Sequence, residues 1–218
     1  MKEKTGTVFS IAKENAPITG CTVSREITEG SVSVQYFALA KNTDISAEMF
    51  PDHKMIIMAD GKAKLYLSDG QTREISIGEC ILTPVDVPVG IRTSCGAVYA
   101  EITVRRNSEM NELVKSGEVF RLAELLPYQN ERIVNMDVVH NDGMKFALMA
   151  FDGGTGLSEH AAPGEAIVFA LEGSAVITYE GREYTIHAGE NFCFARGGRH
   201  AIRAEERFKM GLLLIFEK

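Results

Sequence analysis

Short runs in which apolar and polar residues alternate recur along most of the chain and predict β-strands. The clearest are SVSVQYFALA, KAKLYLSDGQTREISI, SAVITYEGREYTIHAGE and MGLLLIF, which are rich in β-branched or aromatic side chains. Asp-Gly, Glu-Gly and Ala-Gly pairs interrupt these runs, and the sequences SDG and YEG predict hairpin turns. Many short strands at regular spacing are typical of a sandwich or a barrel, so the pattern predicts an all-β protein.

The pattern occurs twice, at a shift of about 111 residues. GTVFSIA (6–12) returns as GEVFRLA (117–123), and ISAEMFPDHKMIIMADG (45–61) returns as LSEHAAPGEAIVFALEG (157–173) without a gap. The length differences between the copies fall where turns are expected, as they do in duplicated domains. The chain is therefore expected to hold two copies of one domain.

The boundary between the copies is expected near residue 108, with an N-terminal domain at 1–108 and a C-terminal domain at 109–218. The joining segment, 108–126, contains strong helix formers at helical spacing, which predicts a helix. The last apolar run, MGLLLIF, is apolar on both faces of a strand, so we expect sheet packing or a partner to cover it.

Charge and composition narrow the class of protein. The formal net charge is −7, and the longest basic run is Arg105-Arg106, which disfavours a nucleic-acid partner. The N-terminus lacks the apolar core of a signal peptide, and no stretch approaches the ~20 apolar residues that span a bilayer. The four cysteines match no zinc or redox spacing and are expected to be free thiols. These features predict a cytoplasmic protein without a membrane partner.

Two histidines of the second copy lie at fixed spacings from glycines. Gly154 precedes His160 and Gly173 follows it, whereas Gly189 precedes His200. These spacings resemble the two motifs of the cupin superfamily, G-x5-H-x-H-x3-4-E-x6-G and G-x5-P-x-G-x2-H-x3-N. Because the repeat covers both halves, the resemblance implies a bicupin. Its fold would be two tandem double-stranded β-helix (jelly-roll) barrels with a few short helices and a site in the barrel mouth.

The C-terminal copy is also similar to small single-domain bacterial cupins, through an S-E-H-x-A-P segment at 158–163 and an E-R-F-K-M segment at 206–210. Single-domain cupins often pair as dimers. The resemblance therefore implies either a monomer with pseudo-two-fold symmetry or a homodimer.

The resemblance also implies a position for each of four metal ligands, normally three histidines and one glutamate. In the C-terminal copy these positions fall on His160, Ala162, Ala166 and His200. Glu165 is one residue out of register, which turns it to the other face of a strand unless the nearby Pro-Gly pair bends the chain. A divalent Fe, Mn, Ni or Zn ion would then be held by His160 and His200, with Glu165 or water as a third ligand.

In the N-terminal copy the same four positions are poorly suited to a metal. They are Glu48, Phe50, Lys54 and Val89. An aromatic and an apolar side chain cannot ligate, and the local histidine, His53, is out of register. We therefore expect no metal in this copy and a role in packing and stability.

The alanines of the C-terminal copy suggest a small-molecule pocket, because small side chains leave room in a barrel mouth. Its expected lining is Ala162, Ala166, Val168, Tyr184, Phe192 and Phe194, with Arg196 and Arg199 near the mouth. The alternative is that the aromatics are ordinary core and the arginines are solvated.

Three functions remain open at this stage, and each has a small molecule as its partner. The first is an enzyme that uses a metal held by His160 and His200. The second is a metal-free isomerase or epimerase acting on a sugar, in which the same two histidines serve as acid and base. The third is a ligand-binding or sensory module without catalysis, and the degenerate first copy favours it.

Overall fold

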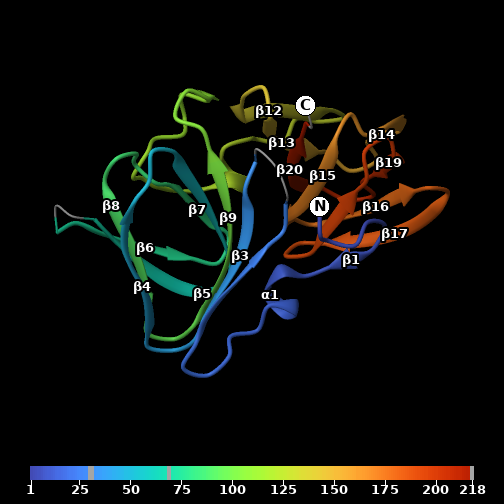
Figure 1. Cartoon of the computed structure of the whole chain (residues 1–218). Coiled ribbons are helices and arrows are strands. Elements are labelled where there is room, and N and C mark those ends of the chain that lie inside the picture. The colour runs from blue at the N-terminus through green and yellow to red at the C-terminus, as the bar shows by residue number, and fades with distance from the viewer. Residues whose placement is uncertain (29–31, 68–69, 217–218) are drawn as a thin grey trace. The chain divides into compact units, whose positions relative to one another are not determined.

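The computed structural model describes residues 1–28, 32–67 and 70–216, and almost all of its regular structure is β (Figure 1). The chain divides into two compact units. The N-terminal unit consists of Ile11–Ser108 with Glu112–Arg121. The C-terminal unit consists of Leu122–Lys218 with Met1–Ser10 and Glu109–Asn111.

The N-terminal unit is built around one long strand, β5. In the described part of the chain, the sheet runs β11-β7-β5-β9-β3-β2, and β4, β8 and β6 join it through the second half of β5. Because β5 pairs with β7 and β9 through its first half and with β6 and β8 through its second, the sheet curls around a core. The elements are α1 (Ile11–Glu14), β2 (Thr22–Glu26), β3 (Val34–Leu39), β4 (Thr43–Met49), β5 (His53–Leu67), β6 (Thr72–Ser76), β7 (Glu79–Leu82), β8 (Pro88–Thr93), β9 (Ala97–Val104) and β11 (Val119–Arg121).

The C-terminal unit contains two antiparallel sheets. Among the described residues, one sheet has the order β1-β18-β15-β20-β13-β12-β10 and the other has the order β14-β19-β16-β17. Its elements are β1 (Val8–Phe9), β10 (Glu109–Met110), η1 (Leu122–Glu124), β12 (Ile133–His140), β13 (Met144–Phe151), β14 (Gly156–Ala161), β15 (Glu165–Glu172), β16 (Ser174–Tyr179), β17 (Arg182–His187), β18 (Asn191–Phe194), β19 (Arg199–Arg203) and β20 (Phe208–Ile215). The apolar strand β20 lies between β13 and β15, which pair with its two edges, and most of its residues are buried, as expected.

The same irregularities recur at matching positions of the two copies. The β5–β9 ladder shifts register between Met58 and Asp60, and the β15–β20 ladder shifts at the matching Ala170 and Glu172. The β4–β8 and β14–β19 ladders also shift at corresponding residues, just before Glu48 and His160. Bulges are designed features of a fold rather than defects, so their recurrence supports duplication of one domain.

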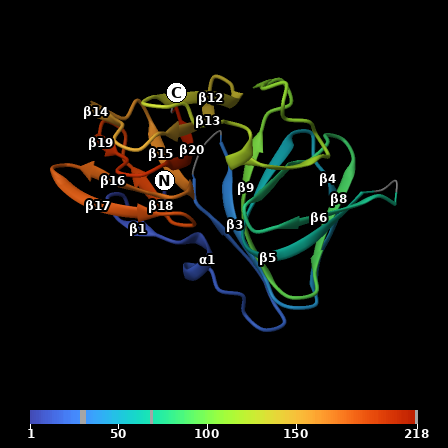
Figure 2. The same cartoon turned by 180° about the vertical axis from the view of Figure 1, so that it is seen from behind.

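Two short edge strands pair across the expected domain boundary. Strand β1, in the repeated segment GTVFSIA, pairs with β18 through Val8 and Phe192. Strand β11, in the matching GEVFRLA, pairs with β7 through Val119 and Ile81. Figures 1 and 2 show the blue β1 among the orange strands of the C-terminal unit. If the chain were divided at residue 108, each unit would thus contain one edge strand from the other side of the division, β1 in the C-terminal unit and β11 in the N-terminal unit.

The helix predicted at 108–126 is wrong. The segment forms β10, an irregular stretch, β11 and the single 3-10 turn η1. The backbone groups of β11 bond to the edge of the β7 sheet, and Gly117 just before it has a φ of +80°, outside the helical range. Tertiary pairing has overridden local helix propensity.

The hairpin turn predicted at YEG is confirmed. Strands β16 and β17 pair directly, and Glu180 and Gly181 between them have φ values of 47° and 75°. Two consecutive positive φ values are the signature of the tight turn whose twist matches paired strands. The matching SDG turn contains residues 68–69, which lie outside the described residues.

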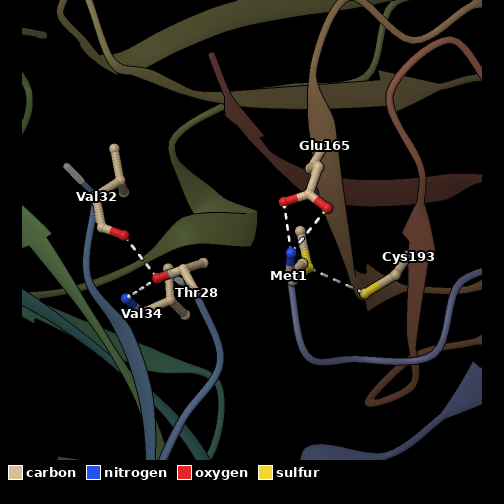
Figure 3. Close-up of polar contacts among 6 residues, drawn as sticks. All are labelled: Met1, Thr28, Val32, Val34, Glu165 and Cys193. Atoms are coloured by element: carbon tan, nitrogen blue, oxygen red, sulfur yellow. Dashed lines mark hydrogen bonds and ion pairs between the residues drawn. The ribbon is translucent and has the colours of Figure 1, made fainter. Parts of the chain in front are cut away.

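Side chains also fix the ends of loops. The Thr28 hydroxyl donates to the Val32 carbonyl at 2.6 Å and accepts from the Val34 amide at 2.9 Å, which anchors the approach to β3 (Figure 3).

In the ranges that the structure describes, no helix has the length and apolar character needed to cross a membrane.

Candidate functional site

The two histidines singled out in the sequence meet in the C-terminal unit. His160 on β14 and His200 on β19 are direct cross-strand partners, and their ring centroids are 4.2 Å apart. The register shift between Leu157 and His160 precedes this pair and sets which residue of β14 faces His200. The spacing argument that singled out both residues thus led to neighbouring side chains.

Backbone carbonyls fix the tautomer of both rings. His160 Nδ1 lies 2.9 Å from the Ser158 carbonyl oxygen, and His200 Nδ1 lies 3.1 Å from that of Gly198. A carbonyl oxygen only accepts, so each Nδ1 carries a hydrogen and each neutral ring keeps its lone pair on Nε2. The described residues provide no hydrogen-bond partner for either Nε2.

The two rings differ in environment. His160 is exposed, whereas His200 is 6% exposed and stacks on Phe194 with centroids 4.1 Å apart. Burial lowers the pKa of His200 below its ordinary value of 6.5; the Gly198 carbonyl opposes this shift and the neighbouring His160 adds to it. His200 is therefore a neutral base at neutral pH, with its proton-accepting nitrogen beside a second imidazole.

The expected pocket residues form an apolar cluster behind the pair. Its buried members from that set are Ala162, Ala166, Val168, Phe192 and Phe194, and the half-buried Tyr184 packs against them. The rings of Phe192 and Phe194 are 5.2 Å apart, and Tyr184 lies 5.3 Å from Phe192. The small alanines thus belong to the same cluster as these aromatic side chains, and the pocket itself stays a prediction.

Sequence analysis missed Tyr179, which ends β16. Its ring contacts both Phe192 and Phe194, and its hydroxyl accepts from the Ala195 amide at 3.3 Å. This bond fastens the loop that leads to His200. The alternation in SAVITY was the available signal, since it places Tyr179 on the buried face with Ala175 and Ile177.

The arginines near the mouth are engaged at the surface. Arg199 is exposed and pairs through its guanidinium with Glu159, at 3.1 Å from Nε to Oε1, and its backbone amide donates to Glu180. Arg196 is exposed in the preceding loop. Glu159 is therefore the surface ion-pair partner of Arg199, and a role of either arginine in drawing an anionic ligand stays a prediction.

The donor set does not fit a resident metal ion. Ala162 and Ala166 have no lone pairs, and Glu165 accepts from the Met1 amino group at 2.8 and 2.7 Å through its two oxygens (Figure 3). Glu165 lies outside the apolar cluster that contains its neighbour Ala166, in keeping with strand alternation. Among the described residues, no three His, Cys, Asp or Glu side chains gather to hold an ion. Two imidazole nitrogens fall short of the three protein ligands of a typical catalytic site.

Comparisons with known proteins agree with this architecture. Residues 147–216 match the family model described as a cupin domain. A cupin 2 conserved barrel domain protein from Leptotrichia buccalis is 24% identical, covers 98% of both chains and has a TM-score of 0.87. No curated protein sequence matches the chain.

Two further solved structures resemble the chain at lower identity. The salicylate 1,2-dioxygenase of Pseudoaminobacter salicylatoxidans, solved with gentisate, is 10% identical over 84% of this chain and 68% of that one, with a TM-score of 0.62. AerE from Microcystis aeruginosa is 17% identical over 92% and 96%, with a TM-score of 0.58. Residues 147–216 are therefore a cupin domain, and the chain as a whole has the cupin fold.

Proposed function

We propose that the chain binds a small hydroxylated metabolite at the His160–His200 pair without a resident metal ion. The observation that carries the proposal is the fixed tautomer of both rings, which leaves a lone pair on Nε2 of each of two rings whose centroids are 4.2 Å apart. Such atoms accept hydrogen bonds from ligand hydroxyls. The incomplete donor set favours this site over one built around a metal.

The same two nitrogens are suited to proton transfer. A neutral imidazole beside a bound hydroxyl or an acidic C–H is a general base, and its protonated form can return the proton. His200, with its lowered pKa, is the better candidate for the base. His160 is exposed to solvent beside it. This division of roles is the chemistry that isomerisation or epimerisation of a sugar needs.

The test uses a panel of aldoses, ketoses and hydroxy acids with EDTA present. We expect a panel member to raise the midpoint of thermal unfolding of the wild type and of His187→Asn, a control at an exposed histidine of β17. His160→Asn and His200→Asn should lose this effect because each removes one acceptor. Turnover of the bound compound would identify an isomerase, and binding alone a binding protein.

Elemental analysis of the wild type provides the second arm. Near-stoichiometric metal that disappears in His200→Asn would overturn the metal-free proposal. Ligand-induced stabilisation that survives both histidine substitutions would overturn the assignment of the site.

A further inference from the structure

The N-terminal unit, whose sequence suggested a copy kept for packing, contains a cavity of about 370 Å³. All four positions that correspond to cupin ligands line it, namely Glu48, Phe50, Lys54 and Val89. They come from β4, the turn after it, β5 and β8. The volume lies within the ~300–1,000 Å³ typical of small-molecule sites. The side chains have changed, but the positions still surround a space.

One part of the cavity is apolar and flat-walled. Phe37 and Tyr99 stack with centroids 5.0 Å apart and planes 10° from parallel. Ile56, Leu65 and Ile91 complete the apolar lining. Parallel aromatic rings with aliphatic side chains around them suit a ring-shaped ligand, which can bury its faces without ordering a flexible chain.

The lysine at the cavity is already fully engaged. Lys54 Nζ donates to Thr103 Oγ1 at 2.9 Å, pairs with Glu101 Oε1 at 3.2 Å and lies 4.7 Å from the centre of the Phe50 ring. The Lys54 and Glu101 side chains are only 14% and 16% exposed. An ammonium group has three donors, and these contacts occupy the space around it. Lys54 is therefore not available to bind an anionic ligand.

The cavity's charges also oppose an ion of either sign. Glu48 and Glu101 repel an anion, whereas a cation would find Glu101 already paired with Lys54 and Glu48 exposed to water. Either ion would also give up part of its hydration on entering the cavity. An uncharged ligand avoids both costs.

A polar contact for such a ligand remains at Tyr99. This side chain is 1% exposed and lines the cavity, yet its hydroxyl has no hydrogen-bond partner among the described residues. Burial, and then the neighbouring Glu101, raise the pKa of Tyr99, so it stays a neutral donor. Burial also raises the pKa of Glu101 against the opposing effect of Lys54, and Glu101 has a second oxygen beyond the one bonded to Lys54.

We propose that this cavity binds an uncharged ring compound bearing a hydroxyl group. The ring lies against the Phe37–Tyr99 wall, and the hydroxyl bonds to Tyr99 and Glu101. The inference is independent of the histidine pair, because every residue that carries it belongs to the N-terminal unit.

Three probes with the same ring and different charge test the ligand class: benzyl alcohol, benzoate and benzylamine. Each is titrated into the full chain, and methyl NMR signals locate the binding. We expect benzyl alcohol to bind most tightly and to shift the methyl signals of Ile56 and Ile91 rather than Ile177 and Ile186 of the other unit. Tyr99→Phe should weaken its binding about two- to tenfold, the effect of one hydrogen bond, and Tyr184→Phe should not.

A pair of neighbouring substitutions tests the location without touching the core. Ser46 is exposed and lines the cavity, whereas the adjacent Ala47 is exposed and does not line it. Ser46→Trp should fill the opening and abolish benzyl alcohol binding, and Ala47→Trp should bind as the wild type does.

Several results would overturn the proposal. Tighter binding of benzoate or benzylamine contradicts an uncharged ligand. Equal binding by the two tryptophan variants, shifts confined to Ile177 and Ile186, or no shifts at the highest soluble probe concentration contradict the site. None of these readouts depends on His160 or His200.

Discussion

At the scale of single residues, two glycines show how tightly the copies conserve one geometry. Gly61 and its repeat partner Gly173 have φ values of +69° and +68°. A Cβ at Gly61 would lie 2.1 Å from the Gly96 carbonyl oxygen, and one at Gly173 would lie 2.0 Å from that of Arg207. Both positions need glycine for its backbone conformation and for a close approach of two chains. Steric hindrance therefore explains why the motif ends in a glycine, Gly173.

Gly173→Ala should therefore destabilise the protein more than Gly181→Ala, a matched control. Gly181 has a similar φ of +75°, but a Cβ there meets nothing within 4 Å. The control should cost roughly 1–2 kcal/mol for the left-handed backbone alone. Gly173→Ala adds a backbone clash, worth a further ~1–3 kcal/mol. Urea unfolding of both variants measures the difference, and equal losses would show that the clash relaxes.

His200 should make the free energy of unfolding depend on pH, and the sign of this dependence follows from the burial of its side chain. Its pKa in the folded chain lies below the ordinary 6.5, so the unfolded chain binds this proton more readily. The free energy of unfolding should thus fall as pH drops from 6.5 to the folded-state pKa and then level off. His200→Asn should remove this part of the slope relative to His187→Asn, as measured by urea unfolding between these pH values.

NMR titration of the imidazole signals gives a direct check of the cause. In His160→Asn the His200 midpoint should move upward, because the neighbouring ring no longer opposes protonation. It should stay below 6.5, because burial is the larger effect. A midpoint that does not move would show that His160 plays no part in the shift.

At the scale of elements, the exchanged strands β1 and β11 stabilise edges of sheets to which they are not adjacent in sequence. Strand β1 covers β18, and the Gly6 amide donates to the Cys193 carbonyl at 3.0 Å. An uncovered strand edge leaves backbone groups unpaired and open to water. Residues 1–10 therefore contribute to the C-terminal unit through backbone pairing as well as through Val8 and Phe9.

Deleting residues 1–10 should selectively expose β18. Amide hydrogen exchange at Asn191–Phe194 should accelerate by at least about tenfold, since its edge partner is lost. Amides of β7 serve as the internal control, because β11 still covers that edge. Unchanged exchange at β18 would mean that this edge does not depend on β1.

At the scale of the whole molecule, the sequence predicted the all-β class, the cupin fold and the meeting of His160 with His200. These follow from local alternation and from spacings that ladder registers preserve. The junction was mispredicted because β11 forms only by pairing with β7, which no local propensity reveals. The cavity around Lys54 was missed because the residues at the ligand positions were judged only by whether they could bind a metal. Their identities do not show how much space lies between the side chains. Glu165 shows the limit of motif reading: its contact with Met1 depends on the exchanged N-terminal segment.

The exchanged strands also have a consequence for the order of synthesis. A ribosome releases β2 to β9 before β11, so the sheet of the N-terminal unit is completed only when residues 119–121 emerge. Strand β1 emerges before the other described strands but has no partner until β18 is made. The N-terminal unit therefore lacks an edge strand until β11 emerges, and the C-terminal unit cannot pair β1 until β18 is made. A nascent chain stalled before β11 carries an open edge at β7 and an unpaired β1, which a chaperone would have to shield.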